Sequence, residues 1–298
     1  MKRILSILLC LVLCIACAGE TVRLQQTEAP TEAPTATPTV EPEPEIASIA
    51  LATEAPSHTP VPAPTPTPSP TPTPSPTPTP SPEPTKDPNR KMVALTFDDG
   101  PNLTLTEPVL EKLREYNVVA TFYVLASAIN DKSGPILQHI VDQGCEIGVH
   151  GLNHNDMTTF SSGTNCKRLL SAAEEISGWI DGGYIPKTMR PPGGKSDGKV
   201  HNGAKAANMA VVKWSVDTAD WLTQNEEKIM AVVKAKTRDG AIILCHDHHQ
   251  PTLNVLDEMI PWLLEQGYDL VTVSELIESS GEQVEPGRVY KCKPGTEP

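Results

Sequence analysis

Between residues 91 and 278, short apolar and β-branched runs alternate with stretches in which apolar residues recur every three or four positions. The short runs predict strands, at residues 92–97, 119–124, 145–149, 187–190, 211–216, 241–245 and 269–272. The longer periodic stretches predict helices, at residues 106–117, 165–180, 225–236 and 254–267. A strand–helix alternation repeated about seven times is typical of an α/β fold with parallel strands, as a barrel or an open sheet.

The first 89 residues lack this alternation. Lys2 and Arg3 precede an apolar run and then small residues, the pattern of a secretory signal peptide over residues 1–16. The segment "CIAC" resembles a bacterial lipobox with Cys17 as the lipidated residue, and plain cleavage with secretion is the alternative. From Pro60 to Pro84 every second residue is proline, which predicts a disordered, Pro/Thr-rich stalk over residues 17–89.

The remaining sequence divides into a predicted catalytic domain over residues 90–279 and a flexible tail over residues 280–298. A net charge of −13 argues against nucleic acid as a partner. Cys145 and Cys245 lie in apolar runs, which favours buried free thiols, while sequence cannot rank the pairings that they could form with Cys166 and Cys292.

Chemically active side chains follow most of the predicted strands. In chain order these are Asp98 and Asp99, "HGLNH" from His150, "RPPGG" from Arg190, "DTADW" from Asp217 and "HDHH" from His246. Because ligands of α/β folds bind at the carboxyl ends of the strands, these side chains are expected to meet in one site.

His150 and His154 are four residues apart, a spacing that lets two imidazoles share one metal ion. Neighbouring side chains at a strand end point in opposite directions, so Asp98 and Asp99 cannot both face that ion equally. One of them is expected to complete an Asp-His-His site, and the other to face the position where a water molecule binds. Three protein ligands and an open position are typical of a catalytic site.

Five segments, "TFDDGPN", "HGLNH", "RPPGG", "WSVDTADW" and "ILCHD", resemble in this order the motif series of the NodB-type polysaccharide deacetylases, carbohydrate esterase family 4. The resemblance extends over residues 91–277 and implies a distorted (β/α) barrel. It also implies that Asp99, His150 and His154 bind one divalent metal ion, with Zn²⁺ expected and Co²⁺, Mn²⁺ or Ni²⁺ as alternatives.

The resemblance implies a role for each remaining motif residue. Asp98 would be the general base, and Arg190 would hold Asp98 ionised and oriented. His246 would protonate the leaving amine, with Asp220 orienting its ring. The implied substrate contacts come from the backbone N–H of Gly193 and the side chains of Trp221 and Leu244.

Two positions depart from the family pattern. Gly151 stands where the second motif usually carries Ser or Thr, and Ala219 where an arginine is common. The lost hydroxyl at Gly151 is expected to weaken support for the metal ligands. Outside the motif roles, His248 and His249 are expected in a solvated loop. Trp214 is expected in the core, with a sugar-binding platform as the alternative.

The resulting hypothesis is a metal-dependent N-deacetylase of cell-wall glycan such as peptidoglycan or chitin-like N-acetylglucosamine. It would be exported, held at the outer face of the cytoplasmic membrane by an N-terminal lipid or secreted to the wall, and monomeric. Acetylxylan O-deacetylation or small-molecule amide cleavage on the same site is one alternative. An inactive wall-binding module on a stalk is the other.

Overall fold

The computed structural model describes residues 90–296. The predicted signal peptide, the lipidation at Cys17 and the stalk therefore lie outside the described residues. Among residues 90–296, no helix combines the length and the apolar character that crossing a membrane requires.

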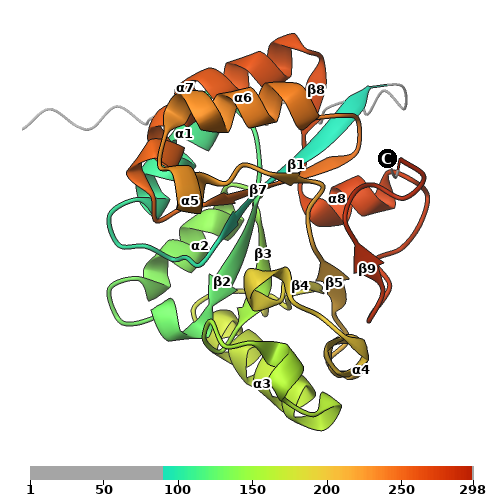
Figure 1. The fold of residues 1–298 in the computed structure, drawn as a ribbon. Helices are drawn as coiled ribbons and strands as arrows, with labels where there is room; N and C mark the ends of the chain where they lie inside the picture. Colours follow the sequence, from blue (N-terminus) through green and yellow to red (C-terminus); the bar gives the residue numbers. More distant parts are fainter. Residues whose placement is uncertain (1–89, 297–298) are drawn as a thin grey trace, which may run out of the picture. The chain divides into compact units, whose positions relative to one another are not determined.

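A nine-stranded sheet of parallel strands forms the centre of the fold, in the order β6-β7-β1-β2-β3-β4-β5-β9, with β8 also paired to β1. The sheet curls into an incomplete barrel with helices around its outside (Figure 1). The strands are β1 (Lys91–Asp98), β2 (Thr121–Leu125), β3 (Glu146–Gly151), β4 (Thr188–Met189), β5 (Ala210–Val212), β6 (Val216–Asp217), β7 (Ala241–His246), β8 (Tyr268–Leu270) and β9 (Val289–Tyr290). The predicted α/β barrel of parallel strands is confirmed.

The outer core lies between the sheet and the helices. Strand side chains alternate in direction, so Val93, Leu95 and Phe97 of β1 pack in this outer layer. The main helices are α1 (Thr106–Glu115), α2 (Gly134–Asp142), α3 (Ser162–Ser177), α4 (Gly198–Ala206), α6 (Glu226–Lys236) and α7 (Gln250–Glu265). Short elements complete the fold: α5 (Asp220–Thr223), α8 (Val273–Glu278), η1 (Ala126–Ala128), η2 (Met157–Thr159) and η3 (Pro192–Gly194).

Helix α8 closes the amino end of the barrel interior. Its apolar residues belong to one cluster with interior residues of β1 and β2; this interior cluster includes Met92, Ala94, Tyr123, Val273, Leu276 and Ile277. A capping box between Thr272 and Glu275 starts the helix. Ser274 donates from its backbone N–H and its hydroxyl to the buried carboxylate of Glu146. The opposite, carboxyl end of the strands is thereby left as the open end.

The predicted strand at 211–216 is two strands. β5 pairs with β4 and β9, whereas β6 pairs with β7 near the other edge of the sheet. Residues 213–215 therefore cross the opening of the barrel between these two edges. Periodicity could not separate the strands, since apolar residues continue through the crossing.

The segment predicted to be a flexible tail is part of the barrel, which corrects the domain boundary at residue 279. Its strand β9 pairs with β5, and Cys292 forms an antiparallel bridge with Ala241 of β7. Tyr290 and Cys292 are buried. Only a very short apolar run marks this segment in the sequence, so its charged and glycine-rich surroundings hid the strand. Cys145, Cys166 and Cys245 are free thiols.

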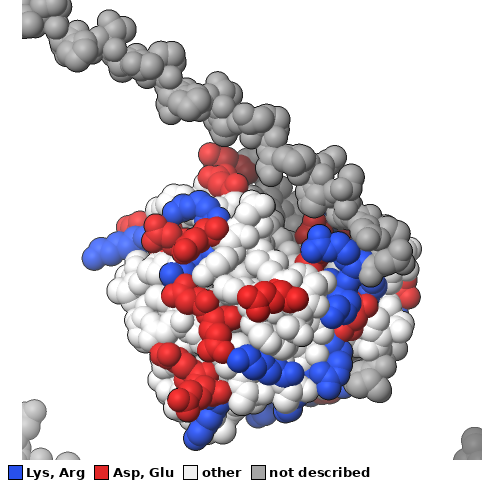
Figure 2. All heavy atoms as spheres, turned by 90° about the horizontal axis from the view of Figure 1, so that it is seen from above, with Lys and Arg blue, Asp and Glu red and all other residues white. Residues whose placement is uncertain are grey.

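Acidic and basic side chains are mixed on the face seen from above, where α6 and α7 lie (Figures 1 and 2). Lys112 pairs with Asp257, and Lys234 with Glu258, each at 2.6 Å. Exposed pairs of this kind contribute at most about 1 kcal/mol each.

Candidate active site

The end of β1 places two carboxylates at the open end of the barrel. Asp98 is the last residue of the strand and is buried, with an exposed fraction of 3%. Asp99 follows with φ 75°, a left-handed conformation that is unusual for a residue with a side chain. This change of backbone direction separates the environments of the two carboxylates, as expected for residues with different roles.

His150 comes from β3, where the pairing with β2 shifts register between Val124 and Leu125. Its ring is buried, and Nδ1 lies 2.8 Å from the carbonyl oxygen of Arg190. A carbonyl only accepts hydrogen bonds, so Nδ1 carries a proton, and in the neutral ring the lone pair is then on Nε2. That lone pair is on the nitrogen nearest Asp99, which is the form a metal ligand requires.

Asp99, His150 and His154 bring three potential ligand atoms within 4.8 Å of one another. Asp99 Oδ1 lies 3.4 Å from His150 Nε2 and 3.7 Å from His154 Nε2. Ligand atoms about 2.0–2.1 Å from a tetrahedral zinc ion lie roughly 3.4 Å apart, so these separations suit such an ion. Burial raises the pKa of Asp99, and the neighbouring imidazoles, when they are protonated, outweigh burial and lower the value to about 2.

An unsatisfied atom supports the same conclusion. Asp99 Oδ1 is buried and accepts no hydrogen bond. Buried carboxylate oxygens are normally hydrogen-bonded, and a bound cation is one of the few partners that replaces such a bond. The three side chains therefore fit a divalent metal ion held by two nitrogens and one oxygen.

Arg190 holds Asp98 from inside the barrel. Its guanidinium is fully buried and donates from Nη1 to Asp98 Oδ1 at 2.6 Å and to Thr96 Oγ1 at 2.8 Å. Nη2 donates to the carbonyl oxygen of Lys213, and the guanidinium lies 4.2 Å from the centroid of the Tyr123 ring. A permanently charged partner at this distance forms a charge-assisted hydrogen bond that fixes the position of a carboxylate.

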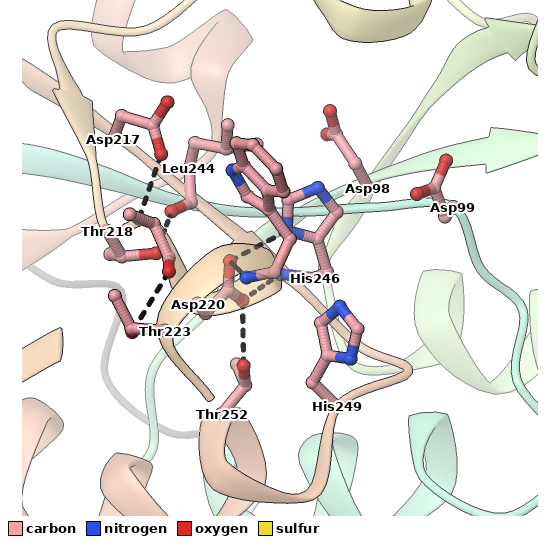
Figure 3. A network of polar contacts seen from close by, with 12 residues as sticks. Asp98, Asp99, Asp217, Thr218, Asp220, Thr223, Leu244, His246, His249 and Thr252 are labelled. Atoms are coloured by element: carbon pink, nitrogen blue, oxygen red, sulfur yellow. Dashed lines mark hydrogen bonds and ion pairs between the residues drawn. The ribbon is translucent and has the colours of Figure 1, made fainter. Parts of the chain in front are cut away.

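Asp220 holds His246 on the other side of the site (Figure 3). Its Oδ1 accepts from His246 Nδ1 at 2.8 Å, and its Oδ2 accepts from the His246 backbone N–H and from Thr252 Oγ1. Burial lowers the pKa of His246, but the hydrogen bond and the charge of Asp220 outweigh it, so the pKa is raised. Burial likewise raises the pKa of Asp220, and the bond from His246 reverses this, so that pKa is lowered.

These groups surround one cavity of about 350 Å³. Its lining residues are Asp98, Asp99, His150, His154, Gly193, Trp214, Asp217, Trp221, Leu244, His246 and His248. Every predicted site residue in the described part of the chain lies on this wall except Arg190 and Asp220. Those two lie directly behind it, in contact with Asp98 and His246.

Three lining residues had no predicted role in the site. Trp214 packs against the interior cluster, as expected for a core residue, and it also lines the cavity. His248, which was expected in a solvated loop, lines the cavity too, as does Asp217. Trp214 lies in the segment between β5 and β6. The sequence predicted a single strand over residues 211–216, so it did not show that Trp214 lies at the barrel opening. For His248, the run of three histidines in "HDHH" was the available signal.

The two departures from the family pattern have distinct backbones. Gly151 has φ 107°, and Ala219 has φ 54° and precedes α5. A serine or threonine at position 151 would be strained in this conformation, which explains the glycine in structural terms.

The polysaccharide deacetylase family model matches residues 85–212. The chain is 36% identical over 200 residues to the peptidoglycan-N-acetylglucosamine deacetylase PgdA of Listeria monocytogenes, a match that covers 67% of this chain and 41% of PgdA. It is 34% identical over 194 residues to a peptidoglycan-N-acetylglucosamine deacetylase of Bacillus cereus, covering 63% of this chain and 89% of the relative. The chain thus spans about two fifths of the length of PgdA.

Among solved structures, the chain is similar to a family 4 acetyl xylan esterase from Clostridium thermocellum in complex with a cobalt ion. The identity is 36% and the TM-score 0.64, and the match covers 68% of this chain and 100% of the esterase. The similarity therefore extends over the whole of that chain.

Proposed function

This chain belongs to the polysaccharide deacetylase family, and we propose that it is a metal-dependent hydrolase that removes N-acetyl groups from cell-wall glycan. One observation carries the proposal. A cluster of three metal-ligand side chains, an arginine-bound carboxylate and a carboxylate-bound imidazole line the same cavity. Hydrolysis of an amide needs a base for water, stabilisation of negative charge and an acid for the amine, and these groups can supply all three.

Asp99, His150 and His154 would hold the ion, with Zn²⁺ as the proposed metal. A bound divalent ion lowers the pKa of water towards about 7 and polarises a carbonyl oxygen. The donor set of two imidazoles and one carboxylate is usual for catalytic zinc sites.

Asp98 would accept a proton from the attacking water. Its ion pair with Arg190 holds the carboxylate in place, and the bond to Thr96 helps to fix that guanidinium. His246 would deliver a proton to the leaving nitrogen, because Asp220 stabilises its protonated ring. A cationic partner for Asp98 and an anionic partner for His246 thus give a base and an acid at the same pH.

The cavity wall supplies the proposed substrate contacts. Gly193 has φ 61° within η3 and would turn its N–H towards the developing oxyanion. Trp221 and Leu244 would receive the acetyl methyl group. Trp221 is 53% exposed, so its ring also remains open to the glycan beyond the acetyl group.

The sequence also supports proposals for location and partners. We infer export through the signal at residues 1–16, attachment to the outer face of the cytoplasmic membrane by a lipid on Cys17, and action as a monomer on peptidoglycan. The relatives named as peptidoglycan deacetylases support this substrate class.

Two other functions compete with this proposal. Acetylxylan O-deacetylation is favoured by the full-length match to the Clostridium thermocellum esterase. An inactive wall-binding module is disfavoured, because a binding protein needs neither the Asp98–Arg190 pair nor the His246–Asp220 pair.

The test is acetate release by the full chain from peptidoglycan, chitin oligomers and acetylxylan, after metal removal with a chelator and after Zn²⁺ is restored. Release that depends on Zn²⁺ and is fastest on peptidoglycan is expected. Faster release from acetylxylan would favour the esterase alternative. Zn²⁺-loaded protein that frees no acetate from any of the three would overturn the enzyme proposal.

A further inference from the structure

The two loops that carry the reacting groups meet just beyond the strand ends. Asp98 of β1 and His246 of β7 are paired neighbours in the sheet. The next residues bring Gly100 and Asp247 into direct contact. A Cβ atom added to Gly100 would lie 2.3 Å from Asp247 Oδ2, so only glycine leaves room for this carboxyl group.

A second contact ties Asp247 to the far end of the same loop. Thr106, the first residue of α1, donates from its hydroxyl to Asp247 Oδ2 at 2.5 Å. The same hydroxyl accepts the backbone N–H of Asn102 at 2.7 Å. The loop from Asp99 to Thr106 is therefore held against Asp247 near both of its ends.

Asp247 has no part in the proposed proton transfers, although it is almost fully buried with an exposed fraction of 1%. Its Oδ1 accepts no hydrogen bond. Burial raises the pKa of this carboxyl group to about 7 in spite of the bond from Thr106. A buried, incompletely satisfied carboxyl group destabilises a fold, so its presence here points to a task that an apolar side chain would not perform.

The backbone beside it is strained. Asp99 keeps φ 75°, and such conformations persist only where the surroundings determine them. Two contacts with Asp247 fix this loop on its β7 side. One is the close approach of Gly100, and the other is the hydrogen bond from Thr106.

We propose that Asp247 is a positioning residue that sets the Asp98–Asp99 loop relative to His246, through its contacts with Gly100 and Thr106. Its effect on turnover rests on the proposed function, whereas its effect on metal binding requires only the Asp99, His150 and His154 cluster. Asp247 would act through Gly100, the residue that follows Asp99, and not through a hydrogen bond to a metal ligand. Loss of the groups that orient metal ligands typically lowers metal affinity by about 10–100-fold.

The alternative is that Asp247 merely anchors the start of α1. The chain offers a matched control at the other end of the barrel. Thr121 donates its hydroxyl to the buried carboxylate of Glu146 and accepts the backbone N–H of Val273, so it makes the same pair of contacts as Thr106. Thr106→Val and Thr121→Val therefore remove equivalent bonds, one beside the site and one far from it.

The experiment compares the full-length wild type, Thr106→Val, Thr121→Val and Asp247→Asn. It measures Zn²⁺ affinity by competition with a chelating dye, kcat and KM for acetate release, and urea unfolding without metal. Thr106→Val and Asp247→Asn are expected to weaken Zn²⁺ binding at least tenfold and to lower kcat at least tenfold, with little change in KM. Thr121→Val is expected to lower stability only.

Thr106→Ser keeps the hydroxyl and should restore Zn²⁺ affinity and kcat, which preserves the test if Thr106→Val does not fold. Unchanged Zn²⁺ affinity and kcat in folded Thr106→Val and Asp247→Asn would overturn the proposal, as would equal losses in Thr121→Val. If the wild type frees no acetate, the proposed function fails, while the Zn²⁺ affinities still decide the role of Asp247.

Discussion

Both ends of the barrel interior contain buried carboxyl groups, but the hydrogen bonding of these groups differs between the two ends. At the amino end, Glu146 accepts bonds from the hydroxyls of Thr121, Thr188 and Ser274 and from the Ser274 backbone N–H. At the carboxyl end, buried atoms of Asp99, Arg190, Asp247 and His248 lack hydrogen-bond partners in the described part of the chain. The hydrogen bonds to Glu146 stabilise the first end, whereas Asp99 Oδ1 at the second end is left without a hydrogen bond and can bind a cation.

Backbone strain follows the same division. Asn117 and Asn208 also have left-handed backbones, but each follows the end of a helix, where this conformation is usual. Asp99 and Ala219 have no such reason, and both border the cavity residues. Strain that is not explained by a turn or a cap therefore lies at the reactive end.

The largest expected effect comes from Asp98→Asn at the reactive end. An amide cannot take a proton from water, so kcat should fall by about 10²–10⁴-fold. Zn²⁺ should remain bound, because Asp99 and the two histidines are intact; elemental analysis and acetate release measure the two quantities. Asp257→Asn, an exposed change on α7, serves as the control and should leave both unchanged. Loss of metal together with activity would mean that the roles of Asp98 and Asp99 are exchanged.

The opposite pattern, a loss of stability and not of activity, is expected from Glu146→Leu at the amino end. Three hydroxyls and a backbone N–H would lose their acceptor, and a buried unsatisfied donor costs about 1–3 kcal/mol. The free energy of unfolding should fall by at least about 2 kcal/mol, measured by urea denaturation. Glu146→Gln should cost less, since the hydroxyls of Thr188 and Ser274 can turn to accept from its amide. The division between the ends is wrong if kcat falls while the free energy of unfolding does not.

Asp220→Asn tests the electrostatics of the reactive end. The pKa of folded His246 is raised above its ordinary value of 6.5, so its protonated form stabilises the fold below that value. This contribution is lost as the pH rises through the folded pKa. Without the Asp220 charge the pKa falls, so the alkaline limb of kcat/KM should move to lower pH.

Imidazole NMR titration of His246 checks the same shift without turnover. Thr252→Val keeps the Asp220 charge and removes only a hydroxyl bonded to it, so it should move the limb less. An alkaline limb that stays in place in Asp220→Asn would show that another group is the acid.

The difference between the two ends also explains what the sequence could predict. Asp98 and His246 are the last residues of their strands and His150 is the last but one, so strand periodicity located them. The metal ligands were found for the same reason, since a parallel sheet brings its carboxyl ends together. Contacts between loops were not accessible in this way. Neither the Asp247 contact with Gly100 nor the place of Trp214 in the cavity follows from spacing.

The amino end was less predictable for a related reason. Glu146 begins its strand as a polar residue in an apolar run, and nothing local indicates that α8 supplies two of its donors. Strand β9 is formed by only Val289 and Tyr290, too few residues to establish a period. Closure of the barrel therefore depends on distant pairings that a pattern of neighbours does not encode.

The smallest expected effect comes from Gly151→Ala, which separates backbone strain from lost chemistry. At φ 107° an added Cβ would be strained and would lie 3.3 Å from the carbonyl oxygen of Asn153, within the "HGLNH" segment that carries both histidine ligands. A cost of about 1–3 kcal/mol is expected, measured by urea denaturation, with Zn²⁺ affinity reduced because His150 precedes the strained residue. Gly163→Ala is the matched control, since no atom lies within 4 Å of its added Cβ and it is the second residue of helix α3. This second change should leave Zn²⁺ affinity alone and raise stability by up to about 1 kcal/mol. If Gly151→Ala binds Zn²⁺ as tightly as the wild type, the histidines are held by their own contacts, and the glycine is needed only for the fold.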